Sequence, residues 1–242
     1  MPFTAHLDEL RSRLIKCCLA IAVAFIGCFA IAEQIFEILT GPIRRIHVPG
    51  LTIIGTAVTE AFFTKMKIAF AAAFIVAMPV LLWQVWQFVA PGLYEHEKRY
   101  TRSFVVCGSV FFFAGAAFCY EVFLGFSLDF LLRRYEAIHV QPLLQMGEYL
   151  SVVSRLVLAF GVMFQLPVLA YFLARVGLID HRFLIRHFRY ALLGIALLAA
   201  VLTPPDLISQ LFFMLPLALL YGISIIVAFF ARQRSESLDT AS

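Results

Sequence analysis

Residues 68–94 read IAFAAAFIVAMPVLLWQVWQFVAPGLY, and these 27 positions contain no charged side chain. A helix needs about 20 apolar residues to cross a bilayer, so this stretch is long enough for one crossing. Five further runs lack Lys, Arg, Asp and Glu, and they cover 17–32, 103–120, 156–174, 190–205 and 207–231. The chain has 242 residues and is 14% charged, whereas a soluble domain carries about 25% charged residues. The sequence therefore predicts a polytopic membrane protein and leaves no room for a soluble catalytic domain.

The fold class that we predict is an all-α polytopic membrane protein with six transmembrane helices in one domain, 1–242. The expected spans are about 15–33, 65–89, 102–121, 153–174, 188–203 and 207–230. Proline removes a backbone hydrogen bond, so kinks are expected at Pro79, Pro167 and Pro216. A hairpin at 203–206 makes the last two spans a short fifth and sixth helix pair, and the fifth has only about 15 apolar residues.

Basic residues predict the orientation of the spans. Six spans place both termini on one side of the membrane. If that side is cytoplasmic, 12 of the 19 Lys and Arg lie inside and 7 outside, as the positive-inside rule requires. We therefore expect a bacterial cytoplasmic (inner) membrane protein with both termini in the cytoplasm and long outer connections at 33–61 and about 121–154. Ala30-Ile31-Ala32 is similar to a signal-peptide cleavage site, but Asp8 and Glu9 precede the first run, so we expect no cleavage there.

The sequence offers no metal, cofactor or catalytic pattern. The five cysteines lie inside apolar runs without C-x-x-C spacing, and all six histidines lie outside the runs, where they could not ligate a membrane haem. Ser224 has no histidine in any run to activate it, so an intramembrane hydrolase is not indicated. We expect no enzyme, no cofactor, no metal and no nucleic-acid partner.

A few polar residues allow both a structural and a functional interpretation. Glu9 and Arg13 are spaced for an i,i+4 ion pair at a solvated helix entrance, but the same acidic patch could bind a basic ligand. Glu97 falls near the start of a helix, where the dipole alone favours a carboxylate. Gln165 lies in the middle of an apolar run, where an amide often joins neighbouring helices. Spacing alone does not decide between these interpretations.

Five motifs occur in a fixed order along the chain. They are HLDELRSRL at 6–14, TEAFF at 59–63, QVWQFVAPGLYEHE at 84–97, FGVMFQLPV at 160–168 and LTPPD at 202–206. Together they resemble the TatC family, the multispanning core of the twin-arginine protein translocase, over nearly the whole chain. The resemblance implies a receptor without catalysis, which binds the N-terminal twin-arginine signal of folded cargo.

The resemblance also implies roles for individual residues. In the family, one acidic residue in the N-terminal motif and another in the first cytoplasmic loop contact the arginine pair. The signal-peptide-binding residues implied here are Glu9, Arg11, Phe88, Pro91 and Glu97. Gln165 stands where the family has Glu or Gln near partner helices, and as an amide it cannot titrate. The residues implied for an outer structural cap are Pro42, Glu60, Pro204, Pro205 and Asp206.

The implied partners are twin-arginine signal peptides, single-span TatA- and TatB-type subunits, further copies of the chain and the lipid bilayer, with export driven by the proton motive force. One alternative is a proton-coupled small-molecule transporter, but it would need an ionisable residue deep in a span, and the clearest deep polar residue is Gln165. A membrane enzyme is the other alternative, and it lacks a readable nucleophile–base pair or metal cluster.

Overall fold

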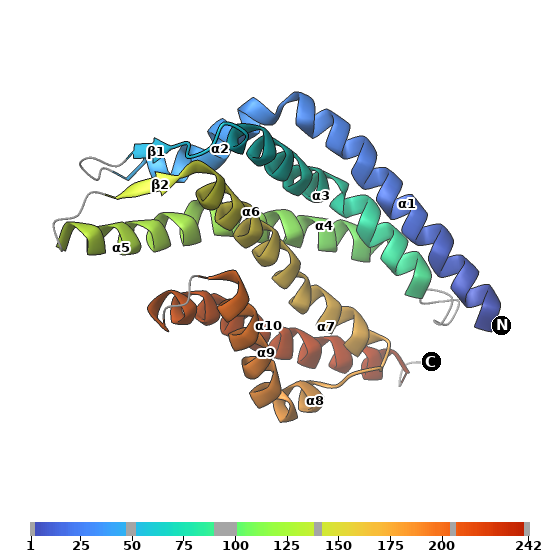
Figure 1. Ribbon diagram of the computed structural model, residues 1–242. Coiled ribbons are helices and arrows are strands. Elements are labelled where there is room, and N and C mark those ends of the chain that lie inside the picture. Colours follow the sequence, from blue (N-terminus) through green and yellow to red (C-terminus); the bar gives the residue numbers. More distant parts are fainter. Residues whose placement is uncertain (1–2, 47–51, 90–100, 138–141, 204–206, 240–242) are drawn as a thin grey trace. The chain divides into compact units, whose positions relative to one another are not determined.

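The computed structural model describes residues 3–46, 52–89, 101–137, 142–203 and 207–239, most of which are helical (Figure 1). The elements in chain order are α1 (Phe3–Ala30), α2 (Ala32–Arg44), β1 (Thr52–Ile54), α3 (Glu60–Val89), α4 (Thr101–Phe118), the π-helical turn η3 (Cys119–Phe123), α5 (Leu124–Ala137), β2 (Leu143–Gln145), α6 (Met146–Met163), α7 (Gln165–Arg175), α8 (His181–Arg186), α9 (Phe188–Leu202) and α10 (Leu207–Asp239).

Five apolar helical segments of the described chain are long enough to cross a membrane. They are Leu7–Ala30, Glu60–Phe88, Arg102–Arg133, Met146–Arg175 and Leu207–Ala231, with 24 to 32 residues each. The predicted fifth span is the shorter apolar helix α9. The all-α polytopic fold class predicted from the sequence is thereby confirmed. The orientation of the termini stays a prediction.

Two helices extend beyond the spans expected from the sequence, although the sixth span itself, Leu207–Ala231, agrees with the expected 207–230. The fifth helix, α9, is short, with 15 residues, but the sixth helix, α10, has 33 residues, because it continues past the apolar run through polar positions that contain no proline. The third span continues through η3 into α5 instead of ending at Glu121. The charge of Glu121 does not end the helix, because its carboxylate lies at the surface and pairs with Arg45 at 2.6 Å.

The prolines lie in different helical contexts. The fourth span divides at Phe164 into α6 and α7, three residues before Pro167. Because Pro167 has no N–H, it cannot donate to the carbonyl of Met163, the last residue of α6. Pro79 and Pro216 lie within α3 and α10, and kinks at these two positions stay predictions.

The residue contacts group into two compact units. One contains Met1–Phe88 and Gly115–Phe160, and the other contains Val89–Ala114 and Gly161–Ser242. In the first unit, Cys28, Ala32, Ala69 and Ala73 form a core of small side chains. In the second unit, α7 and α10 pack together through a cluster that includes Ala174, Ala228 and Ala231. A single six-helix domain covering 1–242 stays a prediction.

The long connections at 33–61 and about 121–154 contain regular structure. β1 and β2 form a parallel two-stranded sheet in which Thr52 pairs with Leu143 and Ile54 with Gln145. The connection at 33–61 also contains α2, and the connection at about 121–154 begins with η3 and α5. These elements lie in the first unit and fix the start of α3 beside the start of α6.

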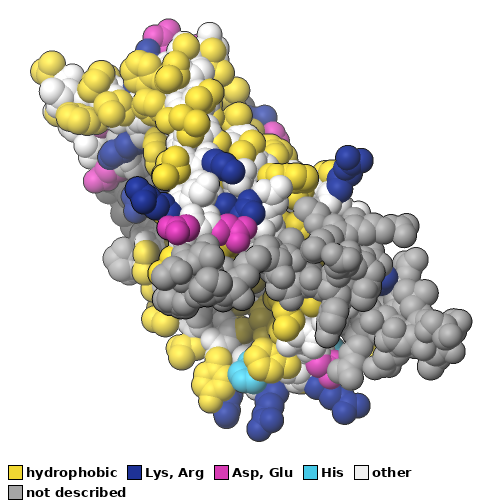
Figure 2. Space-filling model, turned by 90° about the vertical axis from the view of Figure 1, so that its right-hand side faces the viewer, with side chains coloured by type: hydrophobic (Ala, Val, Ile, Leu, Met, Phe, Trp, Pro, Cys, Tyr) yellow, Lys and Arg dark blue, Asp and Glu magenta, His cyan; other side chains and the backbone are white. Residues whose placement is uncertain are grey.

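Large apolar side chains cover much of the exterior. Leu14, Val23, Ile26, Leu215 and Phe230 are each more than 60% exposed. Figure 2 shows hydrophobic side chains widely distributed over the visible face, with acidic and basic side chains next to one another in smaller groups. Hydrocarbon is the solvent that such a surface favours, so the outward side chains agree with a membrane-embedded bundle.

Candidate functional site

Glu9 and Arg13 form the ion pair that their spacing predicts. The Arg13 guanidinium donates to Oε1 of Glu9 from Nη2 at 2.6 Å and from Nε at 3.1 Å. The side chains are 27% and 18% exposed, so water screens this pair only in part. Arg13 also donates from Nη1 to Oε1 of Gln87, near the end of α3. Arg13 therefore joins the N-terminal motif on α1 to the last turn of α3.

The two oxygens of the Glu9 carboxylate differ in their hydrogen bonding among the described residues. Both bonds from Arg13 end on Oε1, and the described part of the chain supplies no partner for Oε2. The neighbouring Asp8 and Arg11 are exposed. A carboxylate that keeps one free oxygen at a half-buried position can accept a charge-assisted hydrogen bond from an incoming cation.

The structure brings together only some of the predicted peptide-binding residues. Phe88 follows Gln87 directly and is half-buried, so it lies close in the chain to the contact that holds Glu9. Arg11 is exposed on α1. Two of the predicted residues, Pro91 and Glu97, lie outside the described residues.

Arg13 and Gln87 are the residues that the sequence-based assignment of this site did not include. The i,i+4 spacing of Arg13 indicated the pair with Glu9. Its second bond to Gln87 joins positions 74 residues apart, and no local pattern predicts such a contact.

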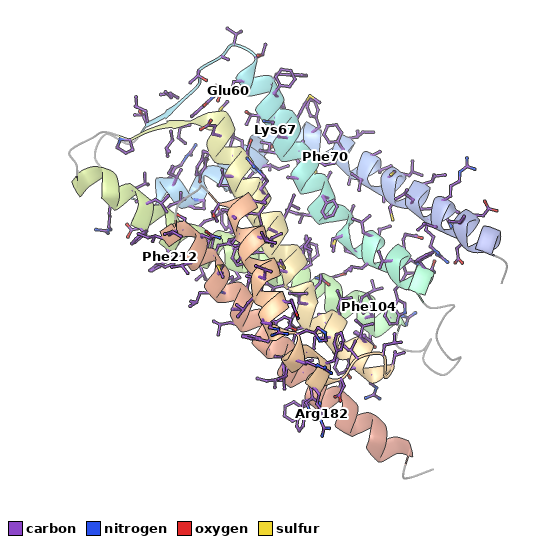
Figure 3. All side chains as sticks on the ribbon, turned by 60° about the horizontal axis from the view of Figure 1, so that its bottom comes forward. Glu60, Lys67, Phe70, Phe104, Arg182 and Phe212 are labelled. Carbon is purple, nitrogen blue, oxygen red and sulfur yellow. The ribbon has the colours of Figure 1, made fainter. Side chains whose placement is uncertain are left out.

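Glu60, predicted for an outer cap, accepts four hydrogen bonds at the start of α3. Its Oε2 accepts from the backbone N–H of Thr56 at 2.6 Å, from the Thr56 hydroxyl at 3.0 Å and from the N–H of Ala57 at 3.3 Å. Its Oε1 accepts from the N–H of Gly147 in α6 at 2.7 Å. In addition, Gln145 donates to the Thr56 hydroxyl at 2.8 Å. One carboxylate thus ties the loop before α3 to the first turn of α6 (Figure 3).

α2 provides a second set of ties in the same unit. Pro42 is buried within this helix. Tyr120 and Tyr149 donate their hydroxyls to the carbonyls of Ile38 and Leu39 at 2.6 and 3.2 Å. The Glu121 carboxylate hydrogen-bonds Arg45 and thereby raises the pKa of that guanidinium. The other predicted cap residues, Pro204, Pro205 and Asp206, lie outside the described residues.

Gln165 is 5% exposed and lies at the first position of α7 in the second unit. Its Nε2 donates to the backbone carbonyl of Gly108 in α4 at 2.9 Å. Its Oε1 is buried and has no hydrogen-bond partner among the described residues. The amide therefore joins two helices with one end and leaves an acceptor unsatisfied at the other, although a buried polar atom is normally hydrogen-bonded.

No metal centre emerges within the part of the chain that the structure describes, since no three His, Cys, Asp or Glu side chains are grouped as ligands there. Among the predicted candidates, Glu9 and Glu60 are carboxylates and Gln165 is an amide, and all three take part in hydrogen bonds in the described structure.

Comparison with known proteins identifies one family. A family model described as the Sec-independent protein translocase protein (TatC) matches residues 5–216. The chain is 44% identical over 228 residues to the TatC protein of Campylobacter jejuni. This alignment covers 92% of this chain and 91% of that protein. It is 43% identical over 223 residues to the TatC protein of Helicobacter pylori strain J99, with 92% and 87% covered.

A solved structure agrees with these relatives. The crystal structure described as the twin arginine translocase receptor TatC matches with a TM-score of 0.86 and 36% identity, and the match covers 93% of this chain and 99% of that chain. Both the sequence match and the fold match extend over nearly the whole chain. The chain is therefore a multi-span membrane protein that belongs to the TatC family of Sec-independent protein translocase components, which are not enzymes.

Proposed function

We propose that this chain is the core receptor and scaffold subunit of a twin-arginine translocase. It binds the twin-arginine signal peptides of folded precursor proteins at Glu9 and Glu97 and passes them on with single-span TatA- and TatB-type subunits, using the proton motive force. The observation that supports this most directly is the Glu9 carboxylate, which is partly shielded, is held by Arg13 and has no partner at Oε2 among the described residues.

The chemistry of the ligand fits that carboxylate. An arginine presents a planar set of N–H donors, and its bonds to a carboxylate are stronger than bonds between neutral groups. Arg13 occupies only Oε1 of Glu9, so a peptide arginine can bind at Oε2 without displacing it. Arg11, Phe88 and Pro91 complete the proposed binding surface.

The first experiment replaces the carboxylate and keeps its shape. We expect Glu9→Gln, and likewise Glu97→Gln, to reduce photocrosslinking of a twin-arginine signal peptide about tenfold, because a charge-assisted bond contributes about 1.5–3 kcal/mol. The matched control is Asp8→Asn, which removes the same charge from the exposed neighbouring position. All variants should reach wild-type levels in the membrane.

A second arm changes the peptide. A peptide with two lysines in place of the arginines should crosslink less well, because an ammonium group cannot make the two parallel bonds of a guanidinium. Wild-type crosslinking by both glutamine variants would disprove the assignment, and so would an equal loss in the Asp8→Asn control.

We propose Gln165 as a contact for a partner subunit. The unsatisfied Oε1 supports this, because a donor from another transmembrane helix would complete its hydrogen bonding. The bond from Nε2 to Gly108 would hold the amide in place while Oε1 is used. Crosslinking of TatA- or TatB-type helices to a probe at position 165 is the test, and labelling by lipid alone would count against the contact.

We further propose that the side of the membrane with β1 and β2 is the outer side, with both termini in the cytoplasm of a bacterium and the chain in its inner membrane. Pro42, Glu60, Pro204, Pro205 and Asp206 then belong to an outer structural cap. The four hydrogen bonds of Glu60 support a structural role there. Further copies of the chain are expected in the assembled translocase.

A further inference from the structure

A groove of about 1020 Å³ lies in the first compact unit between α1, α3 and α6. Its walls are mainly apolar, and Ile21, Phe25, Phe70 and Leu158 contribute large side chains to them. Figure 3 shows Phe70 about one turn beyond Lys67 along α3. Nothing in the function proposed above uses this groove.

Two basic side chains line the groove, and neither has an acidic partner among the described residues. Arg155 donates from Nε to the backbone carbonyl of Ser151 at 3.1 Å on its own helix. Lys67 is exposed and lies in no ion pair of the described chain, whereas Lys65, two residues earlier, pairs with Glu33 at 3.3 Å. None of the described residues that line the groove is acidic, so the charge of this lining attracts an anion.

A buried hydroxyl points to the same kind of ligand. Ser154 lines the groove and is 8% exposed, and its Oγ is buried without a hydrogen-bond partner in the described structure. A buried polar atom without a partner is costly, and native structures contain few of them. A ligand with oxygen atoms beside Arg155 would satisfy this hydroxyl.

Lys67 and Arg155 occupy the same position relative to the charge-free runs of their helices. Lys67 immediately precedes the charge-free run 68–94, and Arg155 immediately precedes the run 156–174. Each residue therefore marks the point where its helix enters the apolar layer, at the level of lipid headgroups. Basic residues between transmembrane helices at this level are suited to lipid phosphates, while the apolar walls extend toward the hydrocarbon.

We propose that this groove binds one anionic glycerophospholipid. Its phosphate is held by Lys67 and Arg155, Ser154 donates to a phosphate or ester oxygen, and an acyl chain covers the apolar wall formed by α1 and α3. Charge complementarity selects this occupant, because the groove combines two unpaired cations with walls that only an apolar tail would cover. Free inorganic phosphate would satisfy the cations and leave those walls bare.

The test uses the full chain, purified and reconstituted into nanodiscs of phosphatidylcholine and phosphatidylglycerol. Native mass spectrometry after partial delipidation measures how much phosphatidylglycerol stays bound. We expect the double variant Lys67→Gln and Arg155→Gln to lower retention by roughly fivefold for each basic residue removed, since each contributes about 1 kcal/mol near an anionic surface. Lys65→Gln is the matched control on the same helix and should retain lipid like the wild type, because Lys65 pairs with Glu33 and does not line the groove.

A second measurement is made on the wild-type chain. It therefore does not depend on whether a variant with altered charge folds. Phosphatidylglycerol carrying a diazirine in its acyl chain should label residues of the groove in the wild-type chain, and Ala22→Trp, which fills the α1 wall, should abolish this labelling. Inorganic phosphate should not displace the lipid.

Each contrary outcome overturns the proposal. Equal retention in the double variant and the Lys65→Gln control would show that the cations do not select the lipid. Displacement by inorganic phosphate would show a simple anion site. Labelling confined to other faces of the chain would show that the lipid does not occupy the groove.

Discussion

Arg13 bonds two acceptors at once, the Glu9 carboxylate on its own helix and the Gln87 amide oxygen on α3. At the scale of single residues, this double contact gives Glu9 a fixed position instead of a freely moving solvated one. Both bonds from Arg13 to Glu9 end on Oε1, and Oε2 has no partner among the described residues. The structural and the functional interpretations of Glu9 are therefore compatible, because the ion pair with Arg13 orients the group that is proposed to bind the signal peptide.

Glu60 gives a stability prediction at the same scale. Glu60→Ala removes the acceptor of four hydrogen bonds and leaves the N–H groups of Gly147, Thr56 and Ala57 without their partner. We expect the Tm of the purified chain to fall by several degrees, measured by thermal unfolding in detergent. Glu37→Ala is the control, because Glu37 is exposed on α2. Equal Tm values for both variants would show that these bonds contribute nothing measurable.

At the scale of helices, small residues set how closely neighbouring elements approach. Cys28 and Ala32 face Ala69 and Ala73 in the first unit. Within a membrane the hydrophobic effect does not drive helices together. Small side chains stabilise the contact instead, because they let the helices pack closely. Gly161 serves the same purpose in the second unit, where the ring of Phe112 lies against it.

Gly161 gives the corresponding prediction for helix packing. A Cβ at this position would lie 2.7 Å from Cε2 of Phe112, whose side chain is fully buried. Overpacking of this kind costs about 1–3 kcal/mol, so Gly161→Ala should lower the Tm. Gly194→Ala in α9 is the matched control, since its Cβ would meet nothing within 4 Å. The Gly194 variant should unfold at the wild-type temperature or above it, and a similar fall in both would contradict the packing argument.

At the scale of the whole molecule, the described chain combines five long spans with one helix, α9, of 15 residues. At 1.5 Å per residue this helix extends about 22 Å, less than the roughly 30 Å of a bilayer core. Thinning of the bilayer near α9, or cover from neighbouring helices, would compensate for the difference.

The orientation of the molecule can be tested through the β1–β2 sheet. Thr52 and Leu143 are paired in the parallel register, and adjacent strands lie about 4.8 Å apart, within the reach of a disulfide. If the proposed topology holds, Thr52→Cys with Leu143→Cys should form a disulfide in growing cells, because the periplasm is oxidising. Trapping of free thiols with a maleimide reagent measures this. The control is Thr52→Cys with Gln145→Cys, a pair that is two residues out of register and should stay reduced. Free thiols in both pairs would refute the orientation.

The sequence by itself determined the membrane class, the number of spans, the shortness of the fifth helix and the family. These properties follow from local quantities, namely uninterrupted apolar length, charge placement and short motifs. The spacing of Glu9 and Arg13 likewise predicted their ion pair, because both residues belong to one helix.

Only the tertiary structure decided which distant residues meet. The bond from Arg13 to Gln87, the tie from Glu60 to Gly147 and the groove with Lys67 and Arg155 each join segments more than 70 residues apart. The length of the third helix was also decided there, since Glu121 pairs with Arg45 at the surface and its charge need not end the helix. Local patterns record what a segment prefers, whereas these contacts depend on how the chain brings separate segments together.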